Sequence, residues 1–304
     1  MSTPTASTLT PDLGAPRARL IAGDLGTVDA ADLVAVIDSV AARASALDRA
    51  DADLREDISA LAGLGLFDVD RTPVAVAATI IEAVATESLA VAFGAWAQRM
   101  TAAYLRHAAD RSDAAMRTYR AVADGKRPGV TGMAAAQRQA VGLGDVPITA
   151  TRVDGGYRID GPIAWASNVY PDSTIVLAAN TEDGRSLVLT FEASASGVEI
   201  RNAPDLLALN ATASTMIGLD GVVVPDEQVL GRTSPTSCRV CARSSSFSRR
   251  HSAPGWAHAR SPRQRGGWKD SGRSIRTSTR RSRDGMSTCT PNSTDSPRFR
   301  TRQP

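Results

Sequence analysis

The hydrophobic pattern of this chain changes its period near Pro128, and that change limits the folds the chain can adopt. Before Pro128, apolar residues recur at the three-and-four spacing of one helix face, as in Leu33, Val36 and Ile37. After it come short runs rich in β-branched residues, separated by pairs that contain glycine. The sequence therefore predicts a multidomain α+β protein, in which an α-helical bundle domain precedes a small β-barrel or sandwich domain.

The helical domain is expected over residues 29–127. Asp29 is placed to cap its first helix, and Gly65 can adopt the left-handed conformation that stops the second. Residues 74–105 are apolar on most sides, which predicts helices buried between neighbours. A last helix is expected over residues 113–123.

The β domain is expected over residues 128–232. Its strands are predicted at residues 148–153, 157–159, 174–179, 186–191, 198–200, 213–217 and 222–224. Four pairs are interpreted as tight turns, because glycine tolerates the positive φ that such turns need: Gly155-Gly156, Asp160-Gly161, Asp183-Gly184 and Asp220-Gly221.

The composition breaks a second time near Arg232. Residues 233–304 hold 15 arginines and one lysine against three aspartates, a net charge of +13, which leaves −10 for the first 232 residues of a chain whose total is +3. They contain 15 serines but neither leucine nor glutamate. Such a segment cannot bury enough apolar surface to offset roughly 1 to 2 kcal/mol of backbone ordering per residue, so a disordered, basic, low-complexity tail is expected. A frameshift near Arg232 would explain its composition.

Cysteine is absent before residue 233, which suits a reduced, cytoplasmic protein. Residues 1–28 are interpreted as a loose lead-in, with no signal-peptide core and no membrane span. Zinc binding by the Cys238, Cys241, His251 and His258 side chains is not expected. Nine and six residues separate Cys241, His251 and His258, which is not the usual finger spacing. No metal site is predicted.

Residues 155–168 carry the motif that is most informative about function, ending in Trp165-Ala166-Ser167-Asn168. This string resembles a signature of the acyl-CoA dehydrogenase family of flavoproteins. In that family the Trp packs beside the flavin and the hydroxyl bonds the N5 edge of the ring. The resemblance implies FAD as cofactor, with Trp165 and Ser167 in contact with it. A flavin that accepts hydride at N5 needs a flat apolar wall to exclude water and one small hydrogen-bond donor aimed at that nitrogen, and Trp165 and Ser167 are expected to supply them.

Further segments are similar to the family in the expected order, so that the resemblance spans residues 29–232. They are residues 61–67 and 81–85 in the helical half, and residues 210–215, 219–225 and 229–231 in the β half. The loop at residues 131–138 departs from the pattern Thr-Glu-Pro-Gly-x-Gly-Ser-Asp and retains only Thr131. By position, Thr131 and Met133 are expected at the flavin, and Gln137 stands where a serine usually helps to hold the substrate thioester.

The resemblance implies α,β-dehydrogenation of an acyl-CoA thioester, in which a glutamate removes the α-proton while hydride passes to flavin N5. It also implies an electron acceptor and a homo-oligomer. The family's glutamate lies in a C-terminal four-helix domain that is not visible after Gly231, so the catalytic residue is left unassigned and the chain is expected to be inactive. Glu82, Glu87 and His107 are expected to have structural roles.

Two alternatives remain open. Flavin-dependent monooxygenases of the dibenzothiophene type share the helical and β domains but lack the glutamate. In the other class, the chain is a non-catalytic protein whose basic tail attracts nucleic acid through phosphates, without sequence specificity and with strong salt dependence.

Overall fold

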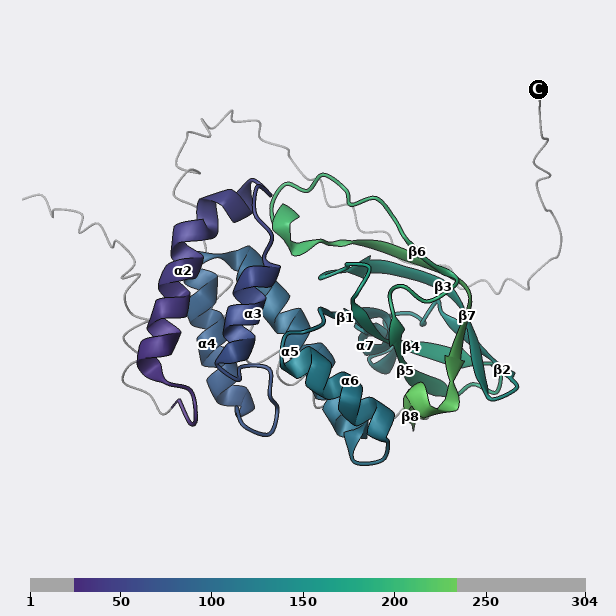
Figure 1. The fold of residues 1–304 in the computed structure, drawn as a ribbon. Coiled ribbons are helices and arrows are strands. Elements are labelled where there is room, and N and C mark those ends of the chain that lie inside the picture. Colours follow the sequence, from purple (N-terminus) through teal and green to yellow (C-terminus); the bar gives the residue numbers. More distant parts are fainter. Residues whose placement is uncertain (1–24, 234–304) are drawn as a thin grey trace, which may run out of the picture. The chain divides into compact units, whose positions relative to one another are not determined.

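The computed structural model describes residues 25–233, and all of them belong to one unit of the chain (Figure 1). Most of the expected lead-in lies outside the described residues. The tail, the frameshift and the zinc-ligand candidates, which all concern residues after Arg232, lie outside them too, apart from Thr233 itself.

Helices make up the first half of the described part (Figure 1): α2 (Ala30–Asp48), α3 (Arg55–Gly63), α4 (Val74–Glu87), α5 (Leu89–Ala109) and α6 (Asp113–Ala123). The Asp29 carboxylate caps α2 as predicted, accepting hydrogen bonds from the backbone amides of Ala31 at 2.8 Å and Asp32 at 3.0 Å. Gly65, with a φ of +77°, follows the end of α3.

Helix α5 joins two hydrophobic cores within residues 25–233. Its first half, including Val91 and Ala95, packs in the core formed by α2, α3 and α4. Its second half, including Tyr104 and Leu105, belongs to the core that lies against the sheet. Figure 1 shows α5 running from the outer helices toward the strands. The apolar character of α5 on most sides, which predicted burial, is explained by this bridging position.

The strands are β1 (Gly129–Gly132), β2 (Thr149–Val153), β3 (Gly156–Ala166), β4 (Thr174–Thr181), β5 (Ser186–Glu192), β6 (Val198–Ile200), β7 (Thr215–Pro225) and β8 (Val229–Thr233). They form one eight-stranded sheet in the order β6-β7-β3-β2-β4-β5-β8, with β1 paired to β4. The β1–β4 and β2–β4 pairs are parallel, and the other pairs are antiparallel.

At the described residues the strands form a single sheet in which no ladder joins β6 to β8, and the barrel or sandwich stays a prediction. Two of the four predicted turns are wrong. Strands β3 and β7 continue through Asp160-Gly161 and Asp220-Gly221, where Gly161 and Gly221 adopt φ values of +129° and +66°. There the Asp160 carboxylate accepts a hydrogen bond of 2.8 Å from the Gly221 amide. The positive φ values accompany an irregularity within the long β3–β7 pair, whose register shifts between Ile159 and Gly161.

The segment expected as a loop at residues 131–138 has regular structure instead. It begins in β1 and continues in a short helix, α7 (Ala134–Ala140). The helix is held against β4 and β5 by Gln139, whose side-chain amide bonds Asn180 at 2.9 Å and 3.3 Å and Ser186 at 3.3 Å. These partners lie about 40 residues further along the chain, so local sequence patterns give no sign of them.

Within the described residues, no helix is long and apolar enough to cross a membrane. Over the same residues, no cluster of His, Cys, Asp or Glu side chains is arranged to hold a metal ion.

Candidate functional site

Trp165 reaches the surface because of a β-bulge. In the β3–β7 pair, Ile163 faces Ile217 and Ala166 faces Thr215, so two residues of β3, Ala164 and Trp165, lie opposite one residue of β7. Both of these residues are exposed, whereas strict alternation would bury one of them. The bulge therefore turns the large indole outward, with 48% of its surface exposed.

Met216 is the β7 residue opposite the bulge. It is also 48% exposed, so an indole and a thioether from neighbouring strands lie next to each other at the surface.

Ser167 follows Trp165 by two residues, and its side chain is buried. Its hydroxyl lies 2.6 Å from the Ser214 hydroxyl, which in turn lies 2.7 Å from that of Thr212. A polar network thus begins beside the exposed Trp165.

Asn168 fixes this motif to the rest of the protein. Its side-chain amide donates to the backbone carbonyls of Gly94 in α5 at 3.0 Å and of Gly129 in β1 at 3.3 Å. Its backbone has a φ of +60°, a left-handed conformation that asparagine tolerates better than most residues. The residue type is therefore explained both by the backbone conformation and by the side-chain bonds.

The structure brings the Thr131 strand alongside the motif. Gly129 of β1 accepts the bond from Asn168, and a Cβ added at Gly132 would lie 3.4 Å from the Ile163 side chain. Thr131 lies between these two contacts and is half-buried. Met133 is 1% exposed and belongs to the hydrophobic core.

Gln137 lies on α7 and is half-buried. The side chain that anchors α7 to the sheet is its neighbour Gln139. Glu82 and Glu87 are half-buried on α4, which packs mainly on α2 and α5, and His107 is exposed in the last turn of α5. None of these three residues is on an element that carries the Trp165 motif.

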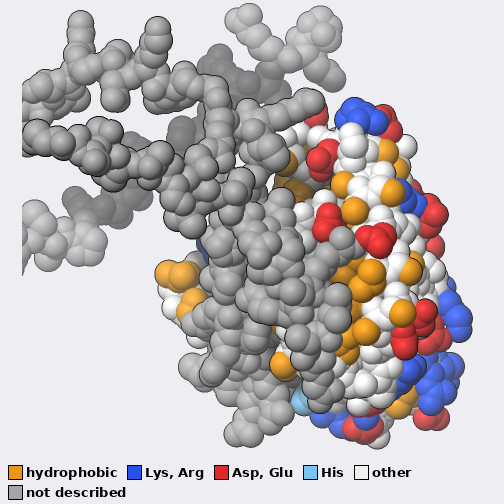
Figure 2. All heavy atoms as spheres, turned by 90° about the vertical axis from the view of Figure 1, so that its left-hand side faces the viewer, with side chains coloured by type: hydrophobic (Ala, Val, Ile, Leu, Met, Phe, Trp, Pro, Cys, Tyr) orange, Lys and Arg blue, Asp and Glu red, His pale blue; other side chains and the backbone are white. Residues whose placement is uncertain are grey.

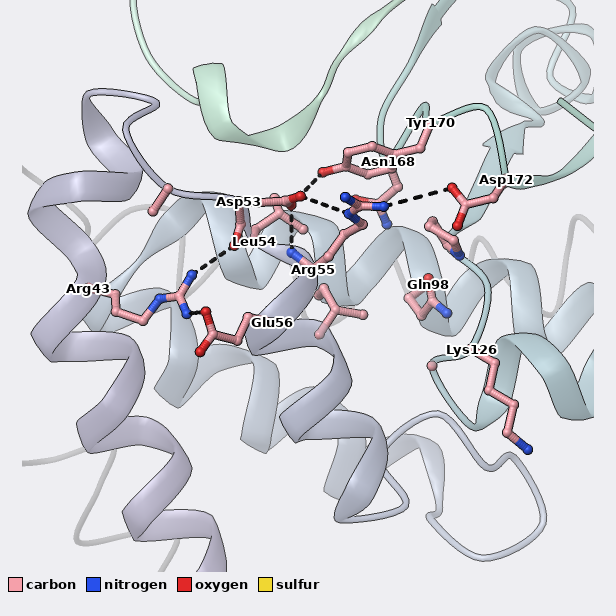
Figure 3. A pocket seen from close by; sticks show the side chains of 14 residues that line it. Arg43, Asp53, Leu54, Arg55, Glu56, Gln98, Lys126, Asn168, Tyr170 and Asp172 are labelled. Carbon is pink, nitrogen blue, oxygen red and sulfur yellow. Dashed lines mark hydrogen bonds and ion pairs between the residues drawn. The ribbon is translucent and has the colours of Figure 1, made fainter. Parts of the chain in front are cut away.

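A cavity of about 700 Å³ lies elsewhere, where the start of α3 meets residues 125–128 and the segment after the motif (Figure 3). Of the motif itself, only Asn168 lines it. The Asp53 carboxylate accepts bonds from the Arg55 side chain at 2.7 Å and from the Tyr170 hydroxyl at 3.1 Å. The Arg55 guanidinium also lies 4.5 Å from the centre of the Tyr170 ring and 3.9 Å from Asp172.

The charges of this cavity are already matched. Burial by itself would raise the pKa of Asp53, but the hydrogen bonds from Arg55 and Tyr170 outweigh it and lower that pKa. Arg43 pairs with Glu56, and Lys126 pairs with Asp124 at 2.9 Å. The cluster thus links α3 to the segment after the motif, and its cations are engaged within the protein.

Sequence reasoning missed Met216, Ser214 and Thr212. The string at residues 210–215 carries part of the family resemblance, but the sequence pattern indicates no role for its hydroxyls. The sequence feature that could have indicated these residues is the run of small hydroxyl residues directly before a β-rich segment. Only the pairing of β3 with β7 brings their hydroxyls close to Ser167.

No family model matches the sequence, and no curated protein matches it. Solved structures do match. Glutaryl-CoA dehydrogenase from Mycobacterium smegmatis superposes with a TM-score of 0.61 at 18% identity, over 80% of this chain and 60% of that one. A glutaryl-coenzyme A dehydrogenase in complex with glutaryl-CoA gives 0.61 at 16%, over 83% and 64%. TdsC from Paenibacillus sp. A11-2, with FMN and indole, gives 0.55 at 18%, over 66% and 52%.

By fold, the chain groups with acyl-CoA dehydrogenases and related flavoproteins, which confirms the resemblance at the level of the fold. It spans less than two thirds of the length of these structures.

Proposed function

We propose that the chain is an acyl-CoA dehydrogenase-like, FAD-dependent oxidoreductase in type. The observation that carries the proposal is the bulge in β3, which exposes Trp165 beside Met216, two residues from the Ser167 hydroxyl. The proposal is supported by the fold, because the dehydrogenases that share it include one in complex with a CoA thioester.

The residues present fit a flavin. Trp165 and Met216 offer an exposed apolar wall that would cover one side of a planar ring and exclude water from it. Ser167 and Thr131 would supply hydroxyls at the edge of the ring. When bound, FAD would supply the electron-accepting chemistry, taking a hydride from the β carbon of an acyl thioester. Met133 would contribute through its backbone, since its side chain serves the core.

The substrate side of the site is less complete. Gln137 is proposed near the thioester only by its position after Thr131. No carboxylate is assigned as the base that would remove the α-proton, and the chain spans 60% to 64% of the two glutaryl-CoA dehydrogenases. We therefore propose weak FAD retention and negligible turnover of acyl-CoA for the 304-residue chain. An electron acceptor and a homo-oligomer remain part of the proposal by family resemblance.

Flavin titration tests this function. We expect the purified full chain to carry little flavin, and added FAD to bind weakly while quenching the fluorescence of Trp165. The Trp165→Ala variant should lose that binding, and the matched Trp96→Phe variant, which changes a half-buried indole on α5, should retain it. Equal affinity of the wild type and Trp165→Ala for FAD would contradict the proposed site. Turnover of an acyl-CoA by the purified chain would contradict the proposed inactivity.

A flavin-dependent monooxygenase of the same fold is the second candidate. It is favoured by the structural match to TdsC with FMN and indole, and by the segment at 131–138, which departs from the dehydrogenase pattern. The two candidates are separated by supplying reduced flavin. Oxygen uptake with an oxygenated aromatic product would favour the monooxygenase, and bleaching of oxidised flavin by an acyl-CoA would favour the dehydrogenase.

A non-catalytic protein with a nucleic-acid-binding tail is the remaining class, and the tail lies outside the described residues. On the uncovered part of the face in Figure 2, acidic and basic side chains are interspersed with hydrophobic ones. Binding of DNA that weakens steeply with salt, together with no affinity for flavin, would favour this class.

Sequencing the coding DNA tests the frameshift. If another frame downstream of Arg232 encodes no leucine-rich helical pattern with a glutamate, the frameshift hypothesis is wrong.

A further inference from the structure

Three buried hydroxyls form a continuous chain that begins at Ser167, two residues after Trp165. The Ser167 and Ser214 oxygens lie 2.6 Å apart, and the Ser214 and Thr212 oxygens lie 2.7 Å apart. Thr212 then donates to the backbone carbonyl of Leu209 at 2.7 Å. All three side chains are at most 7% exposed.

The carbonyl at the end of this chain fixes the direction of every proton in it. A carbonyl only accepts, so the single proton of Thr212 must point to Leu209. Ser214 must then donate to Thr212, and Ser167 must donate to Ser214. The Ser167 proton therefore points into the protein, and only its lone pairs remain for a ligand.

The backbone that holds these hydroxyls is in an unusual conformation. Leu209 and Ala213 flank the 3-10 turn Asn210–Thr212 and adopt φ values of +67° and +47°, which non-glycine residues rarely do. Backbone hydrogen bonds from the motif stabilise the segment, with the Asn168 amide donating to the Thr212 carbonyl at 2.9 Å. Such conformations persist only where the surroundings enforce them, and they cluster at functional sites.

We infer that Ser214 and Thr212 are positioning residues that make Ser167 a hydrogen-bond acceptor toward the flavin, in place of the donor that the family resemblance implies. The inference rests on the proposed function. Nitrogen N5 accepts a hydrogen bond in the oxidised ring and bears a proton in the reduced ring. A site whose hydroxyl only accepts therefore favours reduced FAD. Ser214 and Thr212 contribute without touching the ring, by setting the direction of the proton.

The first test needs no flavin. A double-mutant cycle of Ser167→Ala and Ser214→Ala, measured by urea unfolding of the full chain, should show coupling. We expect the double variant to lose roughly three- to tenfold less in the unfolding equilibrium constant than the two single losses combined, about the effect of one hydrogen bond. Additive losses would mean that the two hydroxyls do not interact, and would overturn the inference.

The second test compares the affinities of the full chain for oxidised FAD and for chemically reduced FAD, under nitrogen. Ser214→Ala and Thr212→Val should both free the Ser167 proton to point outward. Each should shift the ratio of affinities toward oxidised FAD by roughly three- to tenfold. Thr212→Ser retains the hydroxyl and is the matched control, with no shift expected.

The outcomes separate this inference from the function on which it rests. If the wild type binds FAD but Thr212→Val leaves the ratio unchanged, the inference is wrong and the proposed function stands. If the wild type binds neither form of FAD, the proposed function is wrong and the inference about the flavin is wrong with it.

Discussion

The side-chain amide of Asn168 donates a 3.0 Å hydrogen bond to the backbone carbonyl of Gly94, in the first half of α5. A second bond from the same amide, to Gly129 in β1, measures 3.3 Å. One side chain thus connects the helical region, the first strand and the motif that contains Trp165. Its replacement should be costly for both stability and site geometry.

The Asn168→Ala variant should lose both hydrogen bonds and place alanine at a φ of +60°. We expect a loss of about 2 to 4 kcal/mol in the free energy of unfolding, measured in urea. Asn168→Gly removes the same bonds but tolerates the backbone conformation, so it should be less destabilising by about 1 kcal/mol. Equal losses in the two variants would show that the left-handed backbone costs alanine nothing there.

The Gly94→Ala variant tests how closely α5 approaches the motif. Its Cβ would lie 3.1 Å from both the Asn168 Oδ1 atom and the Leu54 side chain, so one of these neighbours must move. Because Asn168 is held by two bonds, we expect Gly94→Ala to be destabilising, although alanine gains about 1 kcal/mol in helix propensity. Gly63→Ala at the end of α3 is the matched control, because nothing lies within 4 Å of its Cβ. A stabilised Gly94→Ala variant would contradict the close approach.

Arg99 is a buried cation that organises the connection between α3 and α4. Its guanidinium donates to the carbonyls of Leu66 at 3.0 Å and Thr72 at 2.6 Å, and its side chain is 4% exposed. Arg99→Met leaves both buried carbonyls without these donors, so thermal or urea unfolding should show a loss of about 2 to 4 kcal/mol. Arg106→Met, on the same helix, removes only surface ion pairs with Asp70 and Asp110, and should cost less than about 1 kcal/mol. Similar losses in both variants would contradict the role of Arg99.

Asp57 and Asp53 should give opposite dependences of stability on pH. Burial raises the pKa of Asp57 above its ordinary value of 3.8, although the Arg43 charge acts against this. The folded protein therefore binds the proton more readily than the unfolded chain, and the contribution of Asp57 to stability grows as the pH falls through its raised pKa. Burial also acts to raise the pKa of Asp53, but its hydrogen bonds lower it overall, so its contribution is lost as the pH falls below about 3.8.

Urea unfolding of the wild type, Asp57→Asn and Asp53→Asn between neutral and acidic pH measures these contributions. The difference between wild type and Asp57→Asn should move in favour of the wild type on acidification, and the difference for Asp53→Asn should move against it. If both differences in unfolding free energy changed in the same direction on acidification, the assignment for one of the carboxylates would be wrong.

The sequence by itself determined helices α2 to α6, because apolar periodicity and local caps act over one or two turns. The Asp29 cap and the ends of α3 and α6 lie where their residues predict them. Composition likewise set the boundary between helices and strands near Pro128. The Trp165-Ala166-Ser167-Asn168 string indicated the fold, which the structural matches confirm.

Tertiary structure alone decided the rest, since it depends on partners far apart in the chain. An Asp-Gly pair in a sequence predicts a tight turn. Gly161 and Gly221 nevertheless lie within the long β3–β7 pair, with positive φ, because the two strands pair there. The same pairing creates the bulge that exposes Trp165 and brings Ser214 to Ser167, 47 residues away. Periodicity cannot predict such a register, because it records which face is apolar and not which residue lies opposite.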